Sequence, residues 1–335
     1  MKKLCILLIL IFWGIFQAYS TENNPRITYS INDSWQFRLG TSDIGEDGWS
    51  MVSIPHTWNA EDCVDDFPGF YRGTGWYRKN IQVDSVMLSR SLYLFFEGAN
   101  QRTKLFVNRH RVGEHIGGYT FFCFDITPYI REGENQLVVC VDNSYDPEIP
   151  PLSADFTFFG GIYRDVWLIS KGRTALTDAV EANRVAGGGV FVHAENISEQ
   201  HAEVVVKSEV ENKENRNRTV TIETVLVDAG QRIVGKKRRK LALKAGEVGT
   251  VEQRLAVRKP KLWTPETPYL YHVQTRVLDG GILLDGGVTR IGIRSFVFDA
   301  EKGLILNGKP YGQLVGANRH QDFAYVGNAL PNSQQ

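Results

Sequence analysis

The chain has 335 residues, of which 42% are hydrophobic and 23% are charged, a composition typical of a globular protein and not of a disordered one. Lys and Arg together number 38, as do Asp and Glu, which excludes a strong net field that would attract nucleic acid or an anionic membrane. A chain of this length predicts two or three domains.

The first twenty residues differ from all that follow. Two lysines precede an apolar run from Leu4 to Phe16, and small residues follow at Ala18 and Ser20. The run is shorter than the ~20 residues that span a bilayer, and the pattern is typical of a signal peptide over residues 1–20. An uncleaved anchor is the alternative. We expect an exported protein, periplasmic or extracellular, with no membrane partner after cleavage.

Three cysteines remain after the signal peptide: Cys63, Cys123 and Cys140. Their odd number and scattered positions fit neither a disulfide framework nor metal-ligand spacing. We interpret Cys123 and Cys140 as small buried hydrophobic residues, with a bridge between them as the alternative in an oxidising compartment. No metal site is predicted.

Short runs rich in Val, Ile, Tyr, Phe and Thr recur along the chain and end at Gly, Asn, Asp or Pro, which indicates an all-β protein. The spacing of the first runs predicts an antiparallel sandwich. Its candidate strands are Ser91 to Glu97, Gln101 to Val107, Thr120 to Ile126, Gln136 to Asp142 and Tyr163 to Ile169.

A second series of strands follows the small residues at 185–189. Its strand spacing suits an immunoglobulin-like sandwich of ~100 residues. The series includes Val190 to Ala194, Ala202 to Glu209, Thr219 to Asp228, Gly249 to Val257 and Tyr269 to Leu278. A basic cluster at 236–240 lies within it, and we interpret the cluster as a solvated hairpin, not a nucleic-acid site.

Four segments, in this order, resemble glycoside hydrolase family 2, the family of β-galactosidases, β-glucuronidases and β-mannosidases. Any one of them could occur by chance, but the ordered set spans nearly the whole mature chain. The segments are Ile54 to Asn59 with Tyr71 to Lys79, Asp155 to Val166, Pro260 to Tyr271, and Gly292 to Arg294 continuing through Asn307 to Asp322.

The resemblance implies a jelly-roll β-sandwich, then an immunoglobulin-like β-sandwich, then the first strand of a (β/α)8 barrel. The implied domains are a jelly-roll sugar-binding domain over 21–176, the immunoglobulin-like sandwich over 177–296, and the start of a truncated TIM-barrel catalytic domain over 297–335. The apolar segment from Leu314 to Ala317 is the expected barrel strand.

The resemblance also implies the activity. We expect the N-terminal region of an exported retaining exo-β-glycosidase that hydrolyses terminal β-linked sugars, most simply a β-galactosidase, with β-glucuronidase or β-mannosidase as alternatives. The family's two catalytic glutamates lie downstream of this chain, so no catalytic residue is assigned and the chain alone is expected to be inactive. A non-catalytic carbohydrate-binding protein is a competing hypothesis, and an adhesive tandem sandwich is another.

Candidates for substrate binding come from three segments of the chain. By resemblance, Asp155 lies in a jelly-roll loop and His320 at the end of the first barrel strand, where each could bind a pyranose hydroxyl. Asn318 and Asp322 share the second motif, as does Arg319. Trp58 is a candidate for stacking on a sugar ring. The alternatives are a turn residue for Asp155 and a core residue for His320.

The expected partner is an oligosaccharide or another β-glycoside, with no nucleic acid. No cofactor is assigned, although a monovalent or divalent cation in the full enzyme and a homo-oligomer of the full-length protein are compatible with the resemblance.

Overall fold

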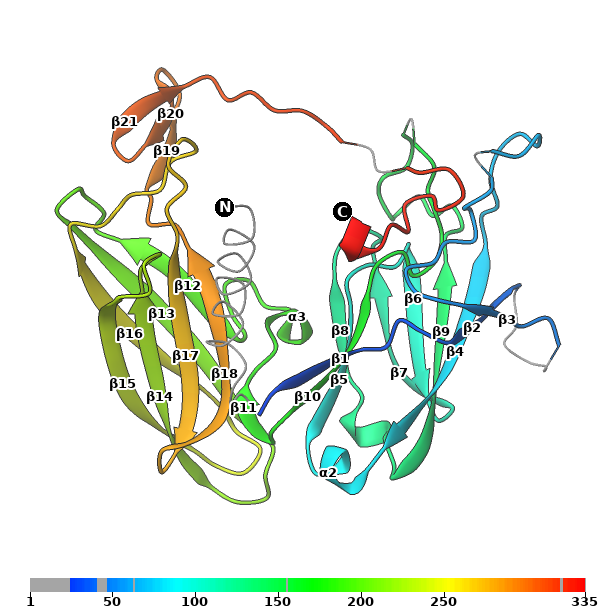
Figure 1. The fold of residues 1–335 in the computed structure, drawn as a ribbon, viewed down its shortest axis with the longest axis horizontal. Helices are drawn as coiled ribbons and strands as arrows, with labels where there is room; N and C mark the ends of the chain where they lie inside the picture. Colours follow the sequence, from blue (N-terminus) through cyan, green and yellow to red (C-terminus); the bar gives the residue numbers. More distant parts are fainter. Residues whose placement is uncertain (1–24, 41–46, 63, 155, 320–321, 335) are drawn as a thin grey trace, which may run out of the picture. The chain divides into compact units, whose positions relative to one another are not determined.

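The computed structural model of the protein describes residues 25–40, 47–62, 64–154, 156–319 and 322–334. The expected signal peptide over residues 1–20 lies outside these ranges. The chain divides into two compact units, and each is described by itself (Figure 1). The first unit comprises Ile27–Ser170 and Ala317–Gln335, and the second comprises Lys171–Gly316 with residues 25–26. Among the described residues, no helix is long and apolar enough to cross a membrane.

The first unit contains two antiparallel sheets. One has six strands in the order β3-β2-β4-β9-β6-β7, and the other has four in the order β1-β10-β5-β8. In chain order the elements are β1 (Ile27–Ser30), β2 (Trp35–Leu39), β3 (Ser50–Val52), β4 (Thr74–Val83), α2 (Ser85–Leu88), β5 (Ser91–Phe96), β6 (Arg102–Val107), β7 (His110–Ile116), β8 (Phe122–Asp125), the 3-10 helix η1 (Thr127–Tyr129), β9 (Gly133–Asp142) and β10 (Val166–Lys171), with the 3-10 helix η2 (Asn332–Gln334) near the end of the chain.

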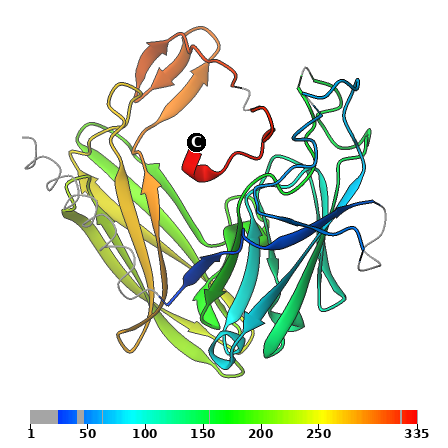
Figure 2. The same cartoon turned by 45° about the vertical axis from the view of Figure 1, so that its right-hand side comes forward.

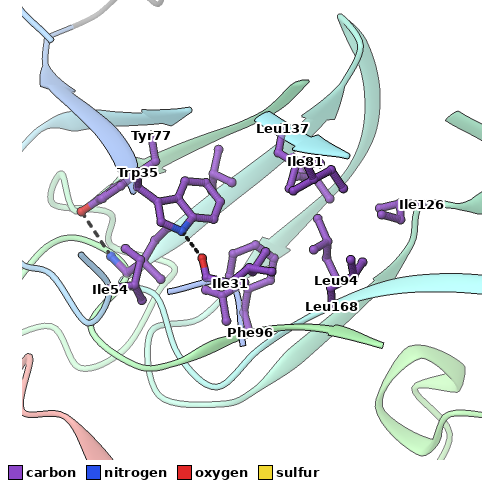
Figure 3. Close-up of a cluster of buried hydrophobic side chains, with 14 of the residues drawn as sticks. Ile31, Trp35, Ile54, Tyr77, Ile81, Leu94, Phe96, Ile126, Leu137 and Leu168 are labelled. Carbon is purple, nitrogen blue, oxygen red and sulfur yellow. Dashed lines mark hydrogen bonds between the residues drawn. The ribbon is translucent and has the colours of Figure 1, made fainter. Parts of the chain in front are cut away.

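Side chains alternate between core and more exposed positions along β2 and β6, as the pleat of a half-buried strand requires. In β6, for example, Thr103, Leu105 and Val107 are buried while their neighbours are partly exposed. The core they build is drawn in Figure 3. Trp35 is fully buried in it, and its indole N–H donates to the carbonyl of Ile31 at 2.6 Å, so the polar atom of the largest core side chain has a partner.

The second unit also contains two packed antiparallel sheets. In one, β13 pairs with β11 and β12 along one edge and with β16 along the other, and the second sheet has the order β15-β14-β17-β18. The elements are β11 (Thr174–Leu176), α3 (Ala179–Ala182), β12 (Val190–Glu195), β13 (His201–Asn212), β14 (Arg218–Val227), β15 (Ile233–Leu243), β16 (Val248–Arg258), β17 (Tyr271–Asp279) and β18 (Ile282–Ile291). Buried residues of both sheets, among them Val206, Leu226 and Val273, form its core.

The prediction of an all-β chain with a jelly-roll sandwich followed by an immunoglobulin-like sandwich is confirmed. The expected strand Ser91 to Glu97 appears as β5, and Gln136 to Asp142 lies within β9. Cys123 in β8 and Cys140 in β9 are buried and are not bridged to each other, so both behave as core residues. Cys63 lies outside the described residues.

The basic cluster at 236–240 lies in β15, an edge strand of its sheet. Strand alternation places Lys236 and Arg238 on one face, where both pair with the carboxylate of Glu223, which is 2% exposed. Arg276 approaches the same carboxylate from β17 at 3.6 Å. Charges along an edge strand also oppose unwanted pairing with another sheet. The cluster is therefore part of a charged sheet face, in which Lys236 and Arg238 neutralise the buried carboxylate of Glu223.

The expected first barrel strand is not formed among the described residues. Instead, β19 (Phe296–Asp299), β20 (Gly303–Leu306) and β21 (Lys309–Gly312) form a three-stranded antiparallel sheet, which extends from the end of the second unit's sandwich in both views (Figures 1 and 2). Leu314 to Ala317 has no ladder partner in the described part of the chain. A strand needs neighbours to pair its backbone N–H and C=O groups, and this segment has none here.

Candidate functional site

A hollow of about 390 Å³ lies in the first unit. Its lining comes from four separate parts of the sequence: the residue after β5, the loop before β8, the loop before β10 and the C-terminal segment 317–335, whose described residues are drawn in red in Figure 1. The lining residues are Glu97, Tyr119, Phe156, Thr157, Phe159, Tyr163, Arg164, Arg319, Asp322 and Asn328.

Four buried polar side chains hold the backbone of residues 158–160, beside the hollow. Thr57 Oγ1 donates to the carbonyl of residue 160 at 2.7 Å, and Asn59 Oδ1 accepts from the amide of the same residue at 2.6 Å. Asn100 and Asn143 donate to the carbonyls of residues 159 and 158 at 2.8 and 2.9 Å. Because unpaired buried backbone groups are costly, these bonds fix the loop that carries Phe156 and its neighbours.

Trp58 belongs to this framework and not to the lining of the hollow. Its ring stacks on Phe37, with centroids 5.9 Å apart, and packs against the core. Gly75 and Gly160 lie so close that a Cβ added at either would come within 2.5 and 2.1 Å of indole atoms. Phe37 thus covers one face of the Trp58 ring, and stacking of Trp58 on a sugar stays a prediction.

His56 contacts Tyr77 beneath the same loop. The imidazole Nδ1 lies 2.8 Å from the Tyr77 hydroxyl, which in turn accepts the backbone N–H of Ile162 at 3.4 Å. This chain of bonds is satisfied when the hydroxyl donates to an unprotonated Nδ1, that is, when the imidazole is neutral. Burial lowers the pKa of His56 from 6.5 to about 4. The neutral imidazole is therefore the form that the fold selects.

This preference predicts acid sensitivity of the first unit. Below pH 6.5 the unfolded chain protonates His56, whereas the folded chain does so only near pH 4. The contribution of the neutral His56 to the free energy of unfolding is therefore complete above pH 6.5 and is lost as the pH falls toward 4. Between about pH 7.5 and 5 we expect a loss of about 2 kcal/mol from His56. Urea unfolding of the wild type and of His56→Gln at both pH values measures it. A wild-type loss no larger than that of the variant would contradict the assignment.

Two tyrosines bring phenol groups to the hollow. Tyr163 is buried, its hydroxyl donates to the carbonyl of Gly118 at 2.6 Å, and burial raises its pKa to about 12. Tyr119 is 52% exposed, and partial burial raises its pKa as well. Both phenols therefore keep their protons at neutral pH. Tyr163 joins the loop before β8 to the loop before β10, and Tyr119 offers its hydroxyl to a ligand.

Glu97 and Asp165 are bridged by a residue from the C-terminal segment. Asn332 Nδ2 donates to Asp165 Oδ2 at 2.7 Å and to Glu97 Oε2 at 3.2 Å, and the Trp167 indole donates to Glu97 Oε1 at 2.8 Å. Burial, followed by the neighbouring charge of Glu97, raises the pKa of Asp165. The bridge ties the C-terminal segment to β5 and to the start of β10, and so helps to close the hollow.

The C-terminal segment also packs on the loop through a glycine. A Cβ at Gly327 would come within 2.5 Å of the Phe159 ring and 3.0 Å of Thr57, so only glycine allows this approach. The segment contributes Arg319, Asp322 and Asn328 to the lining.

The structure brings together only some of the residues expected from the sequence. Asp322 and Arg319 line the hollow, whereas Asn318 is exposed and is not among the lining residues. Asp155 and His320 lie outside the described residues, although both flank lining residues in the sequence. Sequence reasoning missed Glu97, Tyr119, Tyr163 and Arg164. The motif around Tyr163 and Arg164 was a usable signal for those two, but nothing in the sequence connects Glu97 or Tyr119 to the site.

The hollow combines groups that suit a polar ligand with ring faces. Carboxylates accept hydrogen bonds from hydroxyl groups, guanidinium groups donate to acidic or neutral oxygens, and the rings of Phe156 and Phe159 offer apolar contact. Guanidinium groups also pair well with carboxylates. In the described part of the chain, no three His, Cys, Asp or Glu side chains are grouped so as to hold a metal ion.

Comparison with known proteins places these features in a family. Residues 28–172 match the family described as glycosyl hydrolases family 2, sugar binding domain, and residues 184–294 match the family described as glycosyl hydrolases family 2. The first match contains most of the residues that line the hollow.

Individual relatives extend over both sandwiches. A β-glucuronidase of Bacteroides fragilis is 37% identical over 90% of this chain and 42% of its own length, and a β-galactosidase of Bacteroides ovatus is 31% identical over 92% and 36%. The crystal structure of a Bacteroides uniformis β-glucuronidase has a TM-score of 0.83 at 36% identity and covers 91% of this chain and 37% of that chain. The chain spans about two fifths of the length of these relatives.

Proposed function

Because the chain belongs to glycosyl hydrolase family 2, we propose that it is the N-terminal, sugar-recognising region of an exported retaining exo-β-glycosidase that hydrolyses terminal β-linked sugars. The observation that carries the proposal is the hollow of the sugar-binding domain, in which the C-terminal segment joins the anchored loop at 156–164. Its carboxylates, guanidinium groups and rings are those that recognise sugar hydroxyls and ring faces. Export is proposed from the signal-peptide pattern at residues 1–20.

We place β-glucuronides first among the substrates and β-galactosides second, which reverses the order expected from the motifs. Two relatives at 36–37% identity carry the name β-glucuronidase, while the B. ovatus β-galactosidase is 31% identical. Arg164 and Arg319 both line the hollow. A glucuronide differs from a galactoside by a carboxylate, and a guanidinium group binds a carboxylate through two parallel hydrogen bonds.

The substrate order predicts a selective effect of Arg319→Gln. The protein is produced from its gene together with any coding sequence that follows residue 335, and hydrolysis of 4-nitrophenyl β-D-glucuronide and β-D-galactoside is measured. We expect the glucuronide to be the better substrate. Arg319→Gln should raise its KM about tenfold or more, because a charge-assisted bond to the carboxylate is lost, and should leave the KM of the galactoside nearly unchanged.

A second charge variant serves as the control for Arg319→Gln, and two outcomes would contradict the proposal. Lys237→Gln, on the exposed surface of β15 in the other unit, removes the same charge and should change neither KM. Faster hydrolysis of the galactoside would establish the second substrate class. If neither glycoside is hydrolysed while the purified chain binds them at micromolar concentration, the protein is a carbohydrate-binding protein and the enzymatic proposal is wrong.

A further inference from the structure

A second pocket, of about 420 Å³, lies entirely within the immunoglobulin-like second unit. It lies where β16 ends and the chain returns to β17, with one side formed by β15. Its volume falls in the range of about 300–1,000 Å³ that is usual for small-molecule sites. The lining residues are Asp228, Arg232, Val234, Ala256, Val257, Arg258, Lys259, Lys261, Tyr269 and Tyr271.

The charges of this pocket do not cancel. Arg232 is neutralised by Asp228, whose Oδ2 accepts from Nε at 2.9 Å and from Nη2 at 2.8 Å. Asp228 also accepts the backbone N–H groups of Gly230 and Arg232. These bonds, that of Arg232 first, lower the pKa of Asp228, so its carboxylate stays ionised and already has its hydrogen-bond partners. Of the described residues in the lining, Asp228 is the one carboxylate, and four cations face it.

Three cations therefore remain in surplus: Arg258, Lys259 and Lys261. None of the three has an ion-pair partner among the described residues. Lys261 instead lies over an aromatic ring, with its ammonium nitrogen 4.7 Å from the ring centroid of Tyr269. Unpaired cations around a concave surface with a single, already neutralised carboxylate favour an anionic ligand.

Two tyrosines, held by hydrogen bonds to the backbone, give the pocket its ring surface. Their rings meet edge to face, with centroids 5.1 Å apart. The Tyr271 hydroxyl accepts the backbone N–H of Lys261 at 2.9 Å, and the Tyr269 hydroxyl accepts that of Ala229 at 3.2 Å. Both phenols are thus held by the backbone. A preformed wall of this kind reduces the entropy lost on binding.

We propose that this pocket is a second, non-catalytic binding site for an acidic saccharide, that is, a sugar unit bearing a carboxylate or sulfate group. The anionic group contacts Arg258 and Lys261, and the sugar ring packs beside Tyr269. The pocket is a concavity of about 420 Å³, which distinguishes it from a flat basic surface that would bind any polyanion. The proposal does not depend on the activity of the full protein, since it concerns residues of the second unit alone.

Calorimetric titration of the chain at low ionic strength tests the site. The probes are a sulfated disaccharide that contains glucuronic acid and the neutral disaccharide lactose. We expect binding of the acidic disaccharide and none of lactose at the same concentration. The double variant Arg258→Gln with Lys261→Gln should weaken binding about tenfold or more, because two charge-assisted contacts are lost. The binding should also weaken as salt is added.

Two control variants distinguish binding in this pocket from binding elsewhere on the chain. Lys237→Gln with Lys240→Gln removes the same charge from exposed positions of β15 outside the pocket, and should alter binding less than about twofold. Arg319→Gln tests the hollow of the first unit and should leave this binding unchanged. Thermal unfolding confirms that each variant is folded. Equal losses in the two double variants, an unchanged affinity in Arg258→Gln with Lys261→Gln, or equal binding of lactose would each overturn the proposal.

Discussion

Replacement of Gly161 by alanine should lower the free energy of unfolding of the first unit by about 2–5 kcal/mol. Two effects add. The residue has φ of +122°, where a side chain is strained, and an added Cβ would lie 2.6 Å from the His56 carbonyl oxygen and 2.7 Å from the Tyr77 hydroxyl. The first of these neighbours is backbone and cannot rotate away. Gly161 also bridges to Asn100, so its displacement moves the loop that carries the hollow.

The matched control is Gly133, which has φ of +87° but no atom within 4 Å of an added Cβ. Gly133→Ala should therefore show only the backbone strain, about 1–2 kcal/mol. Urea unfolding followed by tryptophan fluorescence reports mainly on the first unit, which contains Trp35, Trp49, Trp58, Trp76 and Trp167. Equal losses for the two variants would show that the contacts around Gly161 relax at little cost, against the prediction.

Replacement of Asp285 by alanine should destabilise the second unit by about 3–5 kcal/mol. Asp285 is fully buried, and its carboxylate binds Arg26 through Nε at 3.0 Å and Nη2 at 2.7 Å. It also accepts the backbone N–H of Leu176 at 2.9 Å. The substitution leaves a buried N–H without a partner and a guanidinium group without its counter-charge, which is the costly way to break a buried pair.

Asp285→Asn provides the conservative comparison, because its amide oxygen can still accept from Leu176. We expect a smaller loss, about 1–3 kcal/mol. Glu199→Ala is the surface control: Glu199 pairs with Lys309 at 3.3 Å with both side chains more than 70% exposed, and the change should cost no more than about 0.5 kcal/mol. Hydrogen exchange of peptides from β11 and β18 locates the effect. Unchanged protection there in Asp285→Ala would contradict the structural role given to this carboxylate.

Much of the fold was predictable because the signals for strands are local. The apolar and aromatic runs, and the Gly, Asn and Asp residues that end them, place β5, β6, β8, β9 and β10 to within a few residues. The strand at Leu314 to Ala317 was expected from the family resemblance instead. A strand also needs a neighbour with which to pair its backbone groups, and this segment has none in the described part of the chain.

The candidate site was less predictable, since it depends on residues that are distant in sequence. Asn59 binds the amide of Gly160 across 101 positions, and Asn332 joins Glu97 and Asp165. Neither contact leaves a local pattern. The surroundings of Trp58 were equally hard to predict: its ring stacks on Phe37 and lies against Gly75 and Gly160, which come from other strands and loops.

By itself, the sequence determined the fold class and the family resemblance, because strand periodicity, turn residues and short ordered motifs are local properties of the chain. Only the tertiary structure decided which side chains share a cavity. The hollow of the first unit and the basic pocket of the second are both built from residues of several strands and loops, and their charge balance depends on which ion pairs form, as between Arg232 and Asp228. Those pairings are set by packing, which no local pattern records.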